Sequence, residues 1–240
     1  HDMSTQFPDV LILAGGFGTR LQSVVSDVPK PMAPVAGKPF LYWLLRWLKP
    51  QNPGQIILCT GYKHEIIESY FGNNFGGIPL CYSVEDTPLG TGGAIKKGFK
   101  LVKTNDVLVL NGDTMLKMNY SPFFEFHLQS NSTFSMALKV MKNPARYGTV
   151  VIENTTIKGF NEKNPDLEEG LINAGVYLLS KNIENHFPVV ANFSFEKEIL
   201  ESKASELLIS GFTTDAYFID IGIPEDYQKA NLEFDALFNN

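Results

Sequence analysis

The sequence of 240 residues has little cysteine and no apolar run long enough to cross a membrane. Its two cysteines, Cys59 and Cys81, each lie within a short apolar run. We therefore expect core thiols in a reducing compartment rather than a disulfide-stabilised fold. The first apolar run, residues 10–13, is too short for the hydrophobic region of a signal peptide. These absences predict a cytoplasmic protein that does not associate with membranes.

Positive charge is also scarce. Lysine and arginine total 20 against 26 aspartate and glutamate residues, which gives a net charge of -6. Because nucleic-acid-binding proteins usually present a broad basic face, we expect no nucleic acid partner. A site for an anionic ligand must therefore be locally basic within an acidic protein.

Two common phosphate-binding motifs are absent from the sequence. No Gly-x-x-x-x-Gly-Lys-[Ser/Thr] loop occurs, which excludes a Walker-type nucleotide site. The dinucleotide fingerprint is incomplete, because Leu21 occupies the position of its third glycine. A dinucleotide site of that kind is therefore not predicted either.

The sequence instead contains a different glycine-rich loop, residues 14–18, directly after the apolar run 10–13. Such a run is typical of a strand that is buried on both faces. Arg20 and Lys30 follow the loop, and prolines on both sides of Lys30 stiffen the backbone there. Glycine amides and two cations at the carboxyl end of a buried strand predict a phosphate-binding site. The alternative is a glycine-rich turn that binds nothing.

Predicted strands and helices alternate along the chain. The expected strands cover residues 10–13, 55–59, 80–84, 107–110, 134–140, 150–153, 156–160, 171–179 and 207–212. The expected helices cover residues 40–49, 63–70, 92–101, 122–129, 195–202 and the segment from 224 onward. This alternation predicts a three-layer α/β fold with a mostly parallel, mixed central sheet and a Rossmann-like nucleotide half.

We expect one domain over residues 1–240, because no linker rich in Pro, Gly or Ser divides the chain. Residues 1–3 are interpreted as a cloning remnant. The nucleotide-binding half is expected at about 4–113, and a second-substrate half at about 114–240.

Two aspartates stand where apolar segments end. Asp113 follows the run 107–110, and Asp220 follows the apolar residues 217–219. Carboxylates at the carboxyl ends of strands face the ligand crevice of an open α/β sheet. Either aspartate alone could equally serve a turn or a helix cap. Together, beside a phosphate site, they predict a Mg²⁺ site, because this ion takes one or two carboxylates and substrate phosphates.

These motifs resemble those of the sugar-1-phosphate nucleotidylyltransferases, in family order over nearly the whole chain. The matching segments are residues 13–21, 29–32, 85–94, 111–113, 146–148, 162–163, 173–175 and 220–227. Within the family, residues 23–25 and 31–34 are similar to the guanylyltransferases for D-glycero-α-D-manno-heptose 1-phosphate. The chain departs from the family pattern at residues 22–25 and at Ile223, which affects no charged group.

The resemblance implies the nucleotide-diphospho-sugar transferase fold, and a reaction that serves surface polysaccharide synthesis. A sugar 1-phosphate displaces pyrophosphate from a nucleoside triphosphate, and a homodimer is allowed. Arg20 and Lys30 would hold the triphosphate, and Asp113 and Asp220 would bind Mg²⁺. The residues expected to contact the nucleotide are Leu13, Ala14, Gly15, Gly16, Gly18, Thr19, Arg20, Glu85, Gly90 and Thr91.

The same resemblance implies a sugar-phosphate site in the second half of the chain. Lys163 would bind the phosphate, Glu162 and Asn173 would bind sugar hydroxyls, and Gly148 would let the sugar approach the backbone. Two structural alternatives remain open. Lys163 could be an exposed hairpin lysine, and Asn173 could serve a turn or a bulge.

Glu85 stands at the base-reading position of the family. Guanine presents two donors on one edge, and a carboxylate can accept both at once. A pyrimidine imide offers only one donor, so Glu85 favours GTP. In the alternative, Glu85 faces solvent and nearby backbone groups read the base.

Other activities stay open on the sequence alone. The enzyme could use mannose or glucose 1-phosphate with GTP, UTP or dTTP. A glycosyltransferase would typically show Asp-x-Asp after the strand, whereas this chain has Asp113-Thr114-Met115. A non-catalytic nucleotide-sugar-binding regulatory subunit would be expected to lose Arg20, Lys30 or an acidic metal ligand, and this chain retains all of them.

Overall fold

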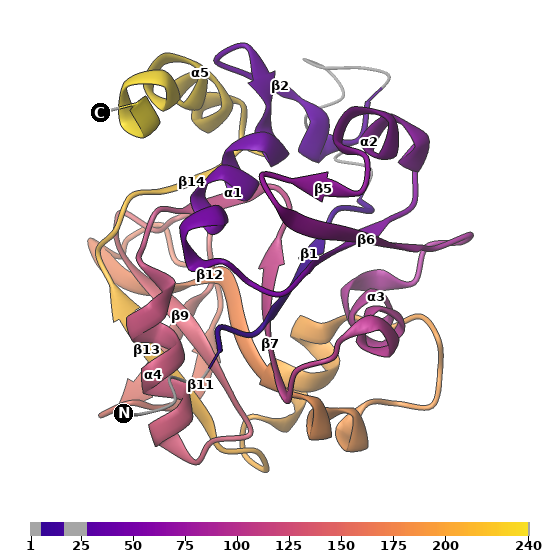
Figure 1. Ribbon diagram of the computed structural model, residues 1–240. Helices are drawn as coiled ribbons and strands as arrows, with labels where there is room; N and C mark the ends of the chain where they lie inside the picture. Colours follow the sequence, from indigo (N-terminus) through magenta and orange to yellow (C-terminus); the bar gives the residue numbers. More distant parts are fainter. Residues whose placement is uncertain (1–5, 17–27, 240) are drawn as a thin grey trace, which may run out of the picture.

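The computed structural model describes residues 6–16 and 28–239, and a large mixed sheet forms its centre (Figure 1). In spatial order, its strands are β10 (Thr149–Glu153), β11 (Thr156–Asn161), β13 (Ile209–Thr214), β9 (Phe134–Lys142), β12 (Glu169–Ser180), β7 (Asp106–Asn111), β1 (Asp9–Leu13), β4 (Ile56–Thr60), β6 (Ile78–Val84) and β5 (Asn74–Phe75). β7, β1, β4 and β6 are parallel, whereas β12 is antiparallel to both its neighbours. The predicted three-layer α/β fold with a mixed sheet is confirmed.

Helices cover both faces of the sheet. They are α1 (Phe40–Leu48), α2 (His64–Phe71), α3 (Gly90–Gly98), α4 (Tyr120–Ser130), α5 (Pro224–Asn239) and a short helix, Glu196–Glu201. Side chains of β1 alternate between the two faces, so that Val10 and Ile12 pack with α1, α2, α4 and α5. Leu11 packs on the other face with α3 and the short helix. Burial on both faces explains why β1 reads as a continuous apolar run.

Two short ribbons lie outside this sheet. They pair β2 (Pro34–Val35) with β3 (Lys38–Pro39), and β8 (Thr114–Leu116) with β14 (Phe218–Asp220). The second ribbon was not predicted, because strands of three residues are too short to show an alternating pattern. It joins the segment after β7 to the segment before α5 and therefore brings two distant aspartates to one place.

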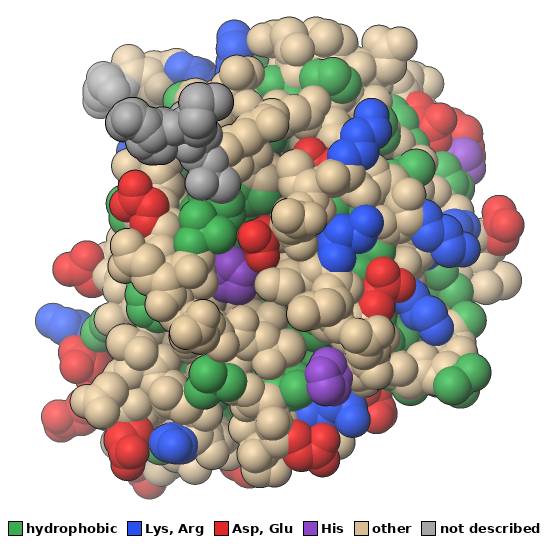
Figure 2. Space-filling model, turned by 60° about the horizontal axis from the view of Figure 1, so that its bottom comes forward, with side chains coloured by type: hydrophobic (Ala, Val, Ile, Leu, Met, Phe, Trp, Pro, Cys, Tyr) green, Lys and Arg blue, Asp and Glu red, His purple; other side chains and the backbone are tan. Residues whose placement is uncertain are grey.

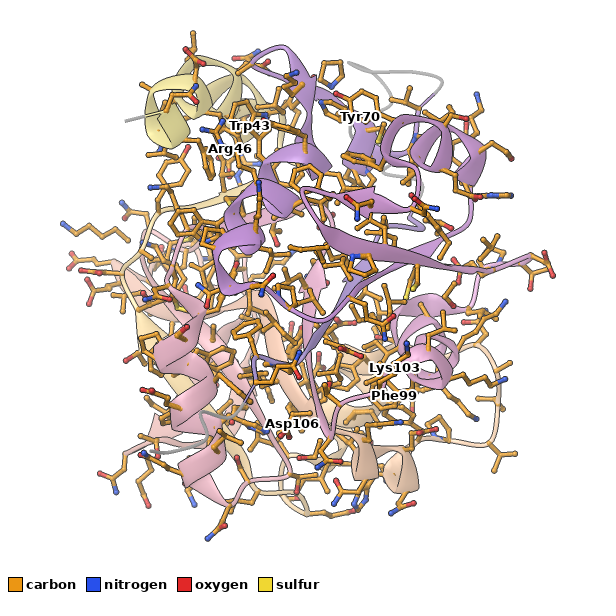
Figure 3. The ribbon with its side chains drawn as sticks, viewed as in Figure 1. Trp43, Arg46, Tyr70, Phe99, Lys103 and Asp106 are labelled. Atoms are coloured by element: carbon orange, nitrogen blue, oxygen red, sulfur yellow. The ribbon has the colours of Figure 1, made fainter. Side chains whose placement is uncertain are left out.

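α5 is anchored by its carboxyl end. Arg46 of α1 donates hydrogen bonds to the Phe238 carbonyl oxygen (2.8 Å) and to the Asn239 Oδ1 (2.7 Å). The Trp43 ring lies 5.9 Å from the Phe234 ring, and Figure 3 shows Trp43 and Arg46 side by side near α5. These contacts hold α5 against α1, and α5 starts only four residues after Asp220.

A buried polar cluster lies at the amino end of β7, where Asp106 is labelled in Figure 3. The His127 ring is 2.7 Å from Ser135 Oγ and 3.1 Å from Asp106 Oδ1, and Ser180 Oγ also donates to that oxygen (3.0 Å). Ser135 is fully buried in β9, so its hydroxyl is out of reach of a substrate. This Ser–His–Asp arrangement therefore satisfies buried polar groups rather than forming a nucleophilic triad.

The face displayed in Figure 2 carries acidic and basic side chains in alternation rather than a concentration of basic ones. Among the described helices, none combines the length and the apolar character that a membrane-spanning helix requires. On the face shown in Figure 2, the excess of acidic residues is thus spread among basic ones.

Candidate active site

A cavity of about 870 Å³ opens at the carboxyl ends of the parallel strands. Its walls are the segments that follow β1, β4, β6 and β7, together with part of β12 and the start of the short helix Glu196–Glu201. Ligands of open α/β sheets bind at this edge. The predicted site residues that line the cavity are Leu13, Gly15, Gly16, Lys30, Glu85, Gly90, Thr91, Asp113, Asn173 and Asp220.

Some predicted nucleotide contacts are not in the cavity wall. Ala14, the first residue of the glycine loop, is buried, and its N–H donates to the Cys59 carbonyl oxygen (2.8 Å). Its contribution is therefore to hold the loop on β4. The predicted residues that lie outside the described part of the chain are Gly18, Thr19 and Arg20.

Lys30 and Asp113 form an ion pair in the cavity wall. Lys30 Nζ lies 2.7 Å from Asp113 Oδ2, and the two side chains are only 14% and 30% exposed. Lys30 begins a short 3-10 turn between two prolines, which fixes its backbone. A Cβ at Gly112 would lie 2.4 Å from the Leu13 carbonyl oxygen, so only glycine lets the segment after β7 approach the end of β1 this closely. The predicted cation and one predicted metal ligand are thus in contact.

Asp220 reaches the same wall through the β8–β14 ribbon. The Ile221 N–H donates to the Asp113 carbonyl oxygen (3.0 Å), and Asp220 pairs with Thr114, so Asp113, directly before β8, lies beside the end of β14. Asp220 Oδ1 accepts the Gly222 N–H (2.8 Å), and the backbone N–H of Asp220 donates to Asp226 Oδ2 (3.0 Å). Asp220 is therefore held through both its backbone and its side chain, and it lines the cavity together with Asp113.

Two carboxylates alone do not complete the coordination shell of a divalent cation, so further ligands are needed. Among residues 6–16 and 28–239, no group of three or more His, Cys, Asp or Glu side chains gathers at a potential metal position. A cation bound by Asp113 and Asp220 would take its other ligands from water and substrate phosphates, as Mg²⁺ does. The donor set therefore fits Mg²⁺ and does not resemble a structural zinc site.

Glu85 lies half-buried at the other end of the cavity, just after β6. Burial raises the pKa of its carboxyl group, while the hydrogen bond from the Leu89 N–H and the charge of Lys97 act in the opposite direction. A Cβ at Gly15 would lie 2.8 Å from Glu85 Oε1, and a Cβ at Gly61 would lie 2.9 Å from its Cγ. Two glycines thus make room for a carboxylate that is turned into the cavity rather than into bulk solvent.

The start of α3 is tied to the segment before the short helix. Gly90 has a φ of +72°, and a Cβ there would lie 2.5 Å from the Phe193 carbonyl oxygen. That carbonyl accepts the Gly92 N–H (2.9 Å), and Thr91 Oγ1 donates to Glu196 Oε1 (2.6 Å). The glycine-rich start of α3 therefore allows the segment around Phe193 to pack closely against it. The hydrogen bond from Thr91 holds Glu196 in the cavity wall.

Asn173 lines the cavity from β12, but much of its amide is already engaged. Its Oδ1 accepts the Gly175 N–H (2.8 Å), and its Nδ2 donates to the Tyr177 hydroxyl (2.7 Å). The structural alternative considered for Asn173 is thus present in part. One amide N–H is left for a ligand, and the sugar-binding role stays a prediction.

The other predicted sugar-phosphate residues meet at one end of the β10–β11 hairpin. Thr149 pairs with Asn161, and a Cβ at Gly148 would lie 2.9 Å from the Asn161 carbonyl oxygen. Gly148 is therefore next to Glu162 and Lys163, and a single sugar-phosphate site could include all three. Neither side chain lines the cavity and both are exposed, so their roles also stay predictions.

Several cavity residues escaped the sequence analysis. Tyr147 lies inside the matching segment 146–148, and Tyr177 stands two residues after the segment 173–175, so aromatic character in or next to a motif could have indicated them. Glu196 could not have been found in this way. Its partner Thr91 is 105 residues away, and no local pattern links the two.

The profile of the family described as Nucleotidyl transferase matches residues 9–236. The chain is 48% identical to a D-glycero-alpha-D-manno-heptose 1-phosphate guanylyltransferase of Aneurinibacillus thermoaerophilus over 225 residues, which covers 94% of this chain and 97% of the relative. It is 45% identical to a protein of the same name from Campylobacter jejuni, covering 90% of this chain and 96% of that protein.

A solved structure has the same fold and a comparable length. HddC from Yersinia pseudotuberculosis, crystallised in complex with GMP-PN, matches with a TM-score of 0.84 at 41% identity. The match covers 95% of this chain and all of that chain (100%). The similarity therefore extends over both halves of the sheet.

Proposed function

This chain belongs to the nucleotidyl transferase family, and we propose that it joins GTP to D-glycero-α-D-manno-heptose 1-phosphate, with release of pyrophosphate. It is a sugar-1-phosphate nucleotidyltransferase, in keeping with relatives that are 48% and 45% identical over most of its length. The observation that carries the proposal is that the predicted phosphate, metal and base residues line one cavity. One wall holds Lys30, Asp113 and Asp220, and the other end holds a half-buried Glu85.

The chemistry is a displacement at the α-phosphorus of GTP. A phosphate oxygen of the sugar forms the new P–O bond, and the bond from the α-phosphorus to the bridging oxygen breaks, so that pyrophosphate leaves. Such a reaction depends on positioning and charge neutralisation rather than on a covalent intermediate. Lys30 and the amides of Gly15 and Gly16 would bind and orient the triphosphate, and Arg20 would join them.

Asp113 and Asp220 would hold Mg²⁺, which supplies charge neutralisation between the two substrates. In the structure, Lys30 Nζ lies 2.7 Å from Asp113 Oδ2. The lysine thereby offsets part of the negative charge that the two carboxylates would present to the triphosphate. Without this cation, two acids and a polyphosphate would repel each other at short range.

At the base end, Glu85 would accept the N1–H and the exocyclic amine of guanine together. The carboxylate is held by the Leu89 N–H on Oε2 (3.3 Å) and stands over Gly15 and Gly61. A partly dehydrated carboxylate is a stronger acceptor than a fully solvated one, because fewer water molecules compete for its oxygens. This arrangement supports reading of guanine rather than of a pyrimidine.

Glu85→Gln is expected to lower kcat/KM for GTP about 10- to 100-fold, because its amide nitrogen would face one of the two guanine donors. The effect on UTP should be much smaller. Because burial raises the pKa of Glu85, the KM for GTP of the wild-type enzyme should increase as the pH falls toward that pKa. The variant should lack this dependence. Steady-state kinetics between pH 5 and 8 measure both effects, and an unchanged GTP preference in the variant contradicts the assignment.

The sugar-phosphate contacts form the second part of the proposal. Gly148, Glu162, Lys163 and Asn173 would bind the sugar 1-phosphate, the first three from the β10–β11 hairpin and Asn173 from β12. Cytoplasmic location and a homodimer stay predictions. The free thiols of Cys59 and Cys81 are compatible with the first.

One assay panel tests the activity. The wild-type protein is incubated with Mg²⁺, with GTP, UTP, dTTP, CTP or ATP, and with heptose, mannose or glucose 1-phosphate, and pyrophosphate release is measured. The highest kcat/KM is expected for GTP with the heptose 1-phosphate. A higher value for a pyrimidine triphosphate or for another sugar contradicts the substrate assignment. No release with any pair favours a non-catalytic binding protein.

A further inference from the structure

Glu196 places a carboxylate in the cavity wall, and it has no role in the reaction proposed for this site. It begins the short helix Glu196–Glu201, and three hydroxyl groups contact it. Thr91 Oγ1 and Ser194 Oγ donate to Oε1 at 2.6 and 3.3 Å, and the Tyr177 hydroxyl is 3.5 Å from Oε2. A negative charge in a site for two anionic substrates requires a specific reason, because it repels both of them.

The two carboxylate oxygens are not equally satisfied. A carboxylate can accept about four hydrogen bonds, two on each oxygen. Oε1 already has two donors, whereas Oε2 has one contact, at the outer limit of hydrogen-bonding distance. Among the ion pairs of residues 6–16 and 28–239, none includes Glu196. Its unused acceptor capacity is thus concentrated on one oxygen beside Tyr177, which itself lines the cavity.

The order of the strands decides which substrate meets that oxygen. Glu85 follows β6, the glycine loop follows β1, and Asp113 follows β7, so that base and phosphates are laid out in this direction across the sheet. The next strand is β12, which carries Tyr177. A sugar that is attached through its phosphate at the β1–β7 position therefore extends toward β12, where the Tyr177 hydroxyl contacts Glu196 Oε2.

We propose that Glu196 is a specificity-determining residue of the sugar site, whose Oε2 accepts a hydrogen bond from a hydroxyl of the sugar 1-phosphate. The inference rests on the proposed function. Thr91 and Ser194 fix the carboxylate through Oε1, and Tyr177 orients Oε2. Sugar hydroxyls are neutral donors that suit this acceptor, whereas the phosphates of either substrate carry no donor for it at neutral pH.

The competing interpretation is that Glu196 only fastens its segment to α3 through Thr91. Glu196→Gln separates the two roles. Glutamine keeps the shape and one oxygen for Thr91, but it places an NH₂ group or a weaker acceptor where the sugar hydroxyl would donate. The matched control is Glu198→Gln, which removes an exposed charge from the same helix.

Glu196→Gln is expected to raise the KM for heptose 1-phosphate about 10- to 100-fold and to leave the KM for GTP within about twofold. The Glu198→Gln control should stay within about twofold of the wild type for both substrates. Calorimetric titration of heptose 1-phosphate, with the non-reacting α,β-methylene analogue of GTP present, should show the same loss of affinity. The melting temperature is measured in parallel, because a fastening role predicts its decrease.

An equal rise in both KM values, or a lower melting temperature with unchanged sugar affinity, overturns the role of Glu196. Absence of turnover in the wild-type protein overturns the proposed function instead. In that case the titration still decides the inference, because it needs no turnover. Wild-type protein that does not bind the sugar phosphate at all would reject both.

Discussion

Replacement of Asp113 by asparagine is expected to lower kcat at least about 100-fold while the fold persists. The amide has the size of the carboxylate and can still accept the hydrogen bond from Lys30 Nζ. It removes, however, one negative charge of the pair with Asp220, which weakens the binding of a divalent cation between the substrates. The contact of the Asp113 carbonyl oxygen with Ile221 belongs to the backbone and is retained.

Pyrophosphate release at saturating GTP and heptose 1-phosphate measures this effect, with the melting temperature as a check on folding. Asp235→Asn is the matched control, because Asp235 is exposed on α5 and far along the helix from Asp220. The control should keep wild-type kcat. Asp113→Asn with wild-type turnover would remove Asp113 from the mechanism.

Lys30→Met is expected to reduce kcat/KM for GTP about 100- to 1000-fold. Methionine fills the same space along the side chain but lacks the ammonium group that lies 2.7 Å from Asp113 Oδ2. Its loss leaves Asp113 without that partner and deprives the triphosphate of a cation held between two prolines. Arginine should restore only part of the activity, because its planar group differs in shape from a compact ammonium.

The measurement is steady-state kinetics with GTP varied at fixed heptose 1-phosphate. Lys158→Met serves as control, since Lys158 is exposed on β11 and outside the cavity. The control should lie within about twofold of the wild type, as is usual for surface changes away from a site. A Lys30→Met enzyme that retains its efficiency with GTP would show that the ion pair with Asp113 is structural only.

The main strands and helices were predictable because their signals are local. The run 10–13 became β1, and the four-leucine stripe of residues 40–49 became α1. The glycine loop and the prolines around Lys30 were predictable for the same reason, because each constrains the backbone within a few neighbouring residues. The β8–β14 ribbon was missed because each strand has three residues and its stability comes from pairing.

The site was predictable as a set of residue types and less so as an arrangement. The residue pattern predicted Lys30, Asp113 and Asp220, the resemblance to a family indicated Glu85, and the fold brings all four to one cavity. The same reasoning suggested sugar contacts for Asn173 without revealing that Tyr177 and Gly175 already bind its amide. Such competition between internal and ligand hydrogen bonds depends on neighbours in space and leaves no mark along the chain.

On its own, the sequence determined the α/β alternation, the phosphate-binding loop and the chemical groups available for catalysis, because each is encoded within a few neighbouring residues. The tertiary structure alone decided how those groups meet. It paired Lys30 with Asp113 across 83 residues and set Glu196 against Thr91 across 105. Contacts at such separations arise only when strand order and packing bring loops together, and no local preference of the chain specifies them.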